Sequence, residues 1–233
     1  MKKILIALIL CNSFFIFSQN KIKIVYDVSF VGEFLTPDPN RKVDISSYTD
    51  GIEDKLNALK FELLINDSTS LFKSISALPR ENETSAEKIA RILSGDNVQY
   101  LRNFKNKKLF QNADAGGTNF NVILNYNNIE WKLENETKKI NNYLCYKATW
   151  KKGKVNVTAW YCPELPYPSG PIEYGNLPGL ILELQRNKLY YTVSKIIFDY
   201  KGFEKISLPE VKYISEKEFN MILQKIMTNL GNQ

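Results

Sequence analysis

The chain contains no histidine among its 233 residues. Because no imidazole is available as a general base, Ser-His-Asp and Cys-His hydrolysis are excluded, and so are metal sites built on histidine ligands. The sequence also lacks a Walker A phosphate loop, a dinucleotide-binding fingerprint and a calcium loop of the EF-hand type. These absences exclude the commonest nucleophilic and cofactor-dependent reactions, and we expect neither a cofactor nor a metal ion.

Strong charge of one sign is also missing. The 31 lysines and arginines exceed the 25 acidic residues by only six, and the longest basic run is Lys105-Asn106-Lys107-Lys108. A nucleic-acid-binding protein usually gathers its basic residues on one face of a recognisable module, and this chain has no such pattern. We therefore expect no nucleic-acid partner. With 44% hydrophobic residues and no linker-like stretch, the chain after its first residues is predicted to be a single domain.

The first 18 residues resemble a secretory signal peptide. Met1-Lys2-Lys3 is a cationic start, residues 4–16 are largely apolar, and Ser18 is a small residue at the end. This predicts export, with cleavage near Ser18, a mature domain of residues 19–233 and a periplasmic or extracellular location. The alternative is a lipoprotein anchored through Cys11, although Leu8-Ile9-Leu10 lacks the small residue expected before such a cysteine. No later segment approaches the length of a transmembrane helix.

Most of the remaining chain has the alternation of β-strands. Residues 21–34 alternate clearly, with Ile22, Ile24 and Tyr26 on one face. Other strands are predicted at residues 61–65 (with a return at 71–72), 98–104, 107–111, 119–125, 129–134, 144–150, 155–161, 179–185 and 189–198. Turn residues separate these segments, which is typical of a large antiparallel sheet.

Three helices are predicted. Thr84-Ser85-Ala86-Glu87 is a capping box that opens a short middle helix, with Gly95 as its stop. Ser215-Glu216-Lys217-Glu218 is a second capping box. It opens a C-terminal amphipathic helix whose apolar stripe we expect to pack on the sheet, the alternative being a stripe that binds a partner or membrane surface. A further short helix is predicted at residues 50–59.

Two cysteines, Cys145 and Cys162, would remain after removal of the signal peptide. They lie in two alternating segments joined by Lys151-Lys152-Gly153-Lys154, which predicts a hairpin. If the turn centres on Gly153-Lys154, the cysteines face each other; if it centres on Lys152-Gly153, Cys145 faces Trp160. Both registers keep the same side chains on the same faces. Because an even pair in an oxidising compartment favours a bridge, we expect a disulfide, the alternative being two separate thiols.

Residues 161–184 hold five of the nine prolines and three of the eleven glycines, followed by an apolar strand. Such a composition specifies one backbone path. Within it, Leu177-Pro178-Gly179-Leu180 fits a type II turn, with positive φ at Gly179, and Asn176 is a second residue that tolerates positive φ. The candidate site or motif residues are Trp160, Pro166, Gly170, Pro171, Gly175, Leu177, Pro178, Gly179, Leu180 and Ile181. We expect them to build a corner of the fold, the alternative being direct contact with a ligand.

The run Gly175-Asn176-Leu177-Pro178-Gly179-Leu180-Ile181 resembles the signature of the GLPGLI family, small secreted proteins of Bacteroidetes-type bacteria. The similarity extends back to Trp131 through Tyr143-x-Cys145-x-Lys147 and Ala159-Trp160-Tyr161. It departs at Asn176, where the family has glycine. The family has no established biochemical function, so the resemblance implies no catalytic residues.

The predicted fold is therefore α+β and mainly β: a curved, half-barrel-like antiparallel sheet with a short middle helix and a C-terminal helix packed on it. The function that follows is a non-catalytic envelope protein that binds an apolar ligand or a protein partner. The alternative is a histidine-independent hydrolase that uses paired carboxylates. Its candidate acids are Glu130, Glu134, Glu136, Glu164, Glu173 and Glu183.

Overall fold

The computed structural model describes residues 21–31, 51–75, 83–115, 117–127, 129–202, 206 and 212–231. The predicted signal peptide lies outside the described residues. The elements are β1 (Ile22–Phe30), α2 (Ile52–Asn57), β2 (Lys60–Ile65), β3 (Thr69–Ser74), α3 (Ser85–Ser94), β4 (Gln99–Asn103), β5 (Lys108–Ala115), β6 (Thr118–Leu124), β7 (Lys132–Ile140), β8 (Tyr143–Lys152), β9 (Val155–Cys162), β10 (Leu180–Arg186), β11 (Leu189–Ile197), β12 (Tyr213–Ser215) and α4 (Glu216–Gly231).

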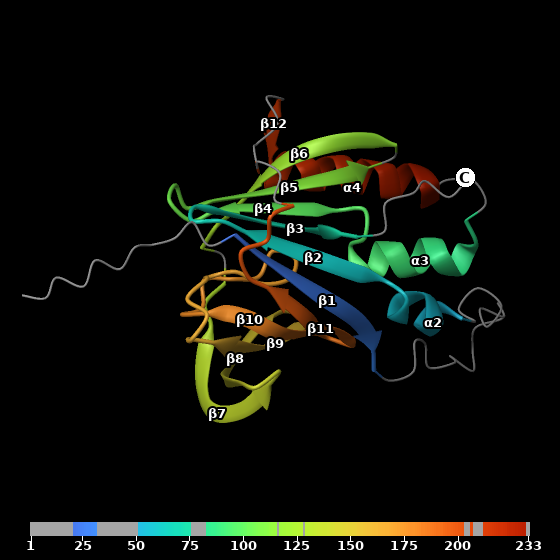
Figure 1. Ribbon diagram of the computed structural model, residues 1–233. Coiled ribbons are helices and arrows are strands. Elements are labelled where there is room, and N and C mark those ends of the chain that lie inside the picture. Colours follow the sequence, from blue (N-terminus) through green and yellow to red (C-terminus); the bar gives the residue numbers. More distant parts are fainter. Residues whose placement is uncertain are drawn as a thin grey trace, which may run out of the picture.

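The described strands form one 12-stranded sheet in the order β12-β6-β5-β4-β3-β2-β1-β11-β10-β9-β8-β7. Neighbouring strands are antiparallel except β12 and β6, which are parallel. The sheet is open, with β12 and β7 as its edges, and Figure 1 shows its strong twist. The predicted α+β, mainly-β class is confirmed.

The first strand lies near the centre of the sheet, and its residues alternate between buried and partly exposed. Ile22, Ile24, Tyr26 and Val28 are all buried, and β1 pairs with both β2 and β11. Tyr26 belongs to a group of stacked and edge-on rings completed by Phe61, Phe72 and Tyr191. Strands far apart in the sequence therefore meet in one core, which no local pattern could specify.

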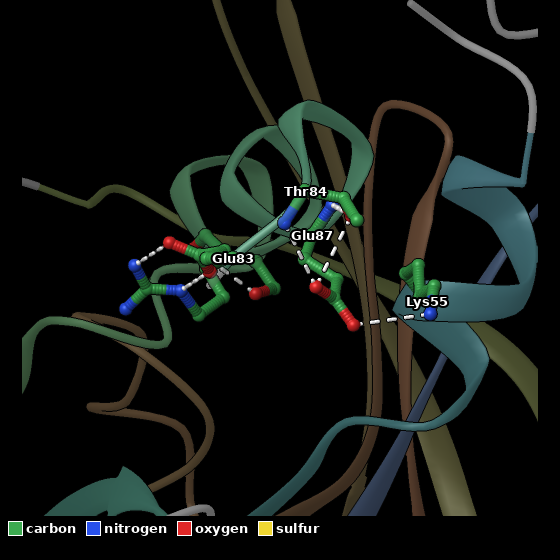
Figure 2. A network of polar contacts seen from close by, with 6 residues as sticks. Lys55, Glu83, Thr84 and Glu87 are labelled. Atoms are coloured by element: carbon green, nitrogen blue, oxygen red, sulfur yellow. Dashed lines mark hydrogen bonds and ion pairs between the residues drawn. The ribbon is translucent and has the colours of Figure 1, made fainter. Parts of the chain in front are cut away.

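The middle helix α3 begins at the predicted capping box, shown in Figure 2. The Glu87 amide donates to Thr84 Oγ1 at 3.2 Å, and the Thr84 amide donates back to Glu87 Oε2 at 3.0 Å. Lys55 on α2 forms an ion pair with the same carboxylate at 3.0 Å. These hydrogen bonds, led by the one from the Thr84 backbone, lower the pKa of Glu87 to about 2. The box therefore both starts α3 and links it to α2.

The C-terminal helix α4 lies beside β5 and β6, where Figure 1 shows it running along the sheet. Phe219 is buried against Phe120, with ring centroids 5.7 Å apart, and Ile226 joins the same small cluster. This confirms that the helix packs on the sheet. The stripe is only partly covered, because Met221 and Leu223 remain exposed.

The β8–β9 hairpin turns at Gly153-Lys154, because Lys152 pairs with Val155. This is the register that places Cys145 opposite Cys162, yet both are free and buried thiols, so the predicted disulfide is wrong. The physical reason is that the β8–β9 ladder ends at Tyr146–Tyr161 although β8 begins at Tyr143. Beyond that pair Cys145 is paired with β7 and Cys162 with β10, and no bridge forms. Burial raises the pKa of Cys145 to about 12 and also raises that of Cys162.

Candidate functional site

The proline- and glycine-rich segment, residues 163–179, connects β9 to β10 by crossing the face of the sheet. Ser169 near its middle is buried and shares a 2.7 Å hydrogen bond with Ser70 on β3. Where the chain re-enters the sheet, the Tyr26 hydroxyl donates to the Ile181 carbonyl at 2.7 Å. The segment is thus held at its middle by β3 and at its exit by β1, and it forms part of the core.

Contacts at the far end of this segment show how strongly the sheet twists. Tyr174 lies against Trp150 on β8, with ring centroids 6.3 Å apart. Two residues later, Asn176 binds Arg102 on β4. In a flat sheet these two strands, seven places apart, would be separated by about 34 Å. The twist brings them around the segment, so this segment occupies the space that an empty half-barrel would enclose.

Arg102 anchors the segment to β4. Its side chain is only 3% exposed. Nη1 donates to Asn176 Oδ1 at 2.9 Å, Nη2 donates to the Glu173 carbonyl at 2.6 Å, and the guanidinium lies 4.8 Å from the Tyr126 ring centroid. No carboxylate of the described residues forms an ion pair with it, and burial lowers its pKa. Because both Nη atoms donate to residues of the segment, Arg102 positions that backbone.

A second charged residue of this region, Glu173, is partly buried and follows a strained residue. Ile172 adopts φ 56°, which is costly for a β-branched side chain. Burial raises the pKa of Glu173, while the nearby Arg186 opposes that rise. Arg186 Nε is itself buried with no hydrogen-bond partner in the described part of the chain. Glu173 and Arg186 therefore interact electrostatically within the fold.

The turn at Gly179 differs from the predicted type II turn. Its φ is positive, as expected, but lies at 156°. The Gly179 amide donates to the Leu177 carbonyl at 2.8 Å, and the Leu180 amide donates to Leu165 in place of Leu177. A Cβ on Gly179 would lie 2.1 Å from the Cys162 carbonyl oxygen. Glycine is needed because the backbone of β9 passes directly against it.

The other predicted motif residues divide into three groups. Gly170, Pro171, Gly175, Leu177, Leu180 and Ile181 are buried. A Cβ on Gly175 would meet the Pro168 carbonyl at 2.7 Å, which again reflects close packing. Pro166 and Pro178 are exposed, and Trp160 lies elsewhere, with the Lys138 ammonium 4.4 Å from its ring centroid. Asn176 adopts φ 63°, as predicted, but its side chain also donates to the Tyr126 carbonyl at 2.6 Å.

A pocket of about 760 Å³ opens beside the same segment. Four parts of the chain meet there: the β2–β3 turn, the residue after β4, the segment itself and the residues after β11. The described lining consists of Asn66, Asp67, Phe104, Glu164, Leu165, Pro166, Tyr167, Pro168, Phe198 and Asp199. Its volume and mainly aromatic and proline walls are typical of a site for a small organic ligand.

Sequence reasoning found two of these residues, Pro166 as a motif residue and Glu164 as a candidate acid, but missed the rest of the pocket, because most of its walls come from parts of the chain that carry no motif. The six candidate acids do not converge. Glu164 lines the pocket, whereas Glu173 is partly buried and is not among the described lining residues. Glu134, Glu136 and Glu183 are paired with lysines on the sheet, and Glu130 is exposed. Within the described residues no group of acidic or cysteine side chains could hold a metal ion.

Comparison with known proteins shows that the segment lies within a match to a family model. Residues 151–183 match the model of a family described as Protein of unknown function (Porph_ging). No curated protein matches the chain. None of the described helices has the length and apolarity needed to cross a membrane.

Solved structures that share the fold include PNGF-II in the P21 space group (17% identity, TM-score 0.57) and PNGF-II in the C2 space group (16% identity, TM-score 0.56). The match covers 90% and 89% of this chain but only 34% and 33% of those chains. This chain is therefore similar in fold to about a third of PNGF-II.

Proposed function

We propose that the protein is an exported, non-catalytic binding protein of the bacterial envelope, related to the GLPGLI family, whose pocket holds a ligand with an apolar body. The observation that carries the proposal is the pocket of about 760 Å³ beside the proline- and glycine-rich segment. Three aromatic side chains, Phe104, Tyr167 and Phe198, line it together with two prolines. Flat rings and prolines present apolar surface with little conformational freedom to lose on binding.

The local packing supports a preformed site. The segment that supplies half of the lining is tied to β3 through Ser169 and to β4 through Arg102. Leu165 at the base of the pocket is buried, whereas Phe198 is 49% exposed. Covering the exposed part of such a ring contributes about 1 kcal/mol, since complete burial of Phe contributes about 1.5–3 kcal/mol. A rigid wall with an exposed ring favours a ligand that covers the ring.

The second candidate function is the carboxylate-based hydrolase, which the three acidic side chains of the pocket lining favour. Asp67, Glu164 and Asp199 are, however, all exposed. A glycosidase keeps one of its two carboxyl groups protonated by placing it in an apolar environment. Glu173, which is partly buried and whose pKa is raised by desolvation, comes nearest to that environment but is not among the described lining residues of the pocket. Binding is therefore the better-supported function.

Titration with N-phenyl-1-naphthylamine, a neutral dye that fluoresces in apolar sites, tests the pocket. We expect saturable binding to the wild type and about fivefold weaker binding to Phe198→Ser, from the ring area above. Leu133→Ser is the matched control, because Leu133 is equally exposed on edge strand β7, and it should bind like the wild type. Equal affinity of Phe198→Ser and the wild type, or no binding to the wild type, would contradict the proposal.

Export is tested separately by the intact mass of protein purified from the native cells. We expect a mature chain that starts near Gln19. A lipid-modified amino terminus at Cys11 would instead show an anchored lipoprotein and would contradict the soluble exported form.

A further inference from the structure

The described lining of the pocket is acidic on a chain that is basic as a whole. Asp67, Glu164 and Asp199 come from three separate segments, and no lysine or arginine is among the described lining residues. The complete chain carries a formal net charge of +6. The pocket thus has the opposite sign to the molecule, and its own potential attracts cations at close range.

These three carboxylates differ from other acidic side chains of the described residues in their ion pairing. In the described part of the chain none forms an ion pair within 4.0 Å, whereas Glu62, Glu136 and Glu183 on the sheet are each paired with lysine. Their charges are therefore available to a ligand. The walls between them are the rings of Phe104 and Phe198, and an aromatic face also attracts a cation.

We infer that the ligand of this pocket is an organic cation, with an apolar body against the aromatic wall and an ammonium or guanidinium group among the carboxylates. The inference rests on the proposed binding function and adds the charge of the ligand to it. The shared chemistry fits a free amine or a basic side chain of a polypeptide. An anionic ligand of the same shape is disfavoured by the three like charges.

The experiment compares two ligands of nearly equal shape, 1-naphthylmethylamine (a cation at pH 7) and 1-naphthylmethanol (neutral), as competitors of the bound dye. With the three carboxylates taken as about 7 Å from the ligand's ammonium group in water, the amine should bind about tenfold more tightly than the alcohol in 10 mM salt. Screening reduces the preference to about threefold in 150 mM salt. The peptide N-acetyl-Phe-Lys-amide is measured beside them. Its affinity relative to the free amine identifies which source of the cation fits the pocket.

The variant Asp67→Asn/Glu164→Gln/Asp199→Asn should bring the two naphthyl affinities within twofold of each other. The control variant Glu53→Gln/Glu130→Gln/Glu216→Gln removes three exposed charges outside the pocket and should retain the preference.

Two failures are distinguishable. If the alcohol competes with the dye but the amine has no advantage in 10 mM salt, the cation inference is overturned and the binding function stands. If neither compound competes and the dye itself does not bind, the proposed function fails first. A preference that persists in the pocket variant also overturns the inference, because the charge then acts from elsewhere.

Discussion

Replacement of Gly179 by alanine tests the reason for glycine in the segment. The added Cβ would lie 2.1 Å from the carbonyl oxygen and 2.5 Å from the carbonyl carbon of Cys162. Both are backbone atoms of β9, and Cys162 is paired with Leu180 in the sheet, so neither can move without breaking the ladder. We expect the free energy of unfolding of Gly179→Ala to fall by about 3 kcal/mol, because backbone strain at φ 156° and overpacking act together.

Urea unfolding followed by tryptophan fluorescence measures this loss. With a slope of about 2 kcal/mol/M, the midpoint of Gly179→Ala should fall by about 1.5 M. Asparagine should not rescue position 179, because its tolerance of positive φ applies near 57° and does not remove the clash. This reverses the expectation from the turn signature alone, in which asparagine would be the mildest replacement.

Gly153 provides the matched control. Its φ is 59°, and a Cβ there would meet no atom within 4 Å. Gly153→Ala should therefore lose only about 1 kcal/mol, and Gly153→Asn should be nearly neutral. If Gly179→Ala and Gly179→Asn unfold within about 0.3 M of the wild type, the close approach to Cys162 is refuted.

Three further predictions use the same protein. The Asn176→Gly variant should lose about 2 kcal/mol of unfolding free energy in the urea assay, because Arg102 Nη1 and the Tyr126 carbonyl each lose a hydrogen-bond partner. An unchanged midpoint would show that position 176 requires only a residue that tolerates positive φ. Both cysteines should react with a thiol reagent in urea without reductant, and the absence of a free thiol there would contradict the prediction. In the native state Cys145 should react very slowly, because at its pKa of about 12 only about one thiol in ten thousand is ionised at pH 8. The folded state depresses the pKa of Glu87 to about 2, so its stabilisation is complete above the ordinary carboxyl pKa and is lost as the pH falls toward 2. The gap between the urea midpoints of wild type and Glu87→Gln should therefore narrow from pH 6 to pH 2, and a constant gap would refute the link.

Local features of the fold could be predicted because their causes are local. The capping box at Thr84 needs only residues three apart, and the alternation of β1 needs only its own side chains. The hairpin at Gly153 was limited to two registers, and pairing of Lys152 with Val155 selects one of them.

Other elements lacked such a local cause. Strand β7 was predicted at residues 129–134 but lies at Lys132–Ile140, because an edge strand with mostly exposed side chains shows no apolar alternation. The parallel pair of β12 with β6 joins segments about ninety residues apart and has no turn to announce it.

The sequence by itself determined the class of the fold, the start of α3, the strand pattern and the chemistries that the lack of histidine excludes, since composition and short-range periodicity contain that information. The tertiary structure determined which residues far apart in the sequence are in contact. It left Cys145 and Cys162 as free thiols although the hairpin register opposes them, placed the β9 backbone where Gly179 can have no side chain, and put the Arg102 guanidinium beneath the segment. It also assembled one pocket from four separate parts of the chain. Those outcomes depend on the twist of a 12-stranded sheet, a property of all its strands together, which no single stretch of residues encodes.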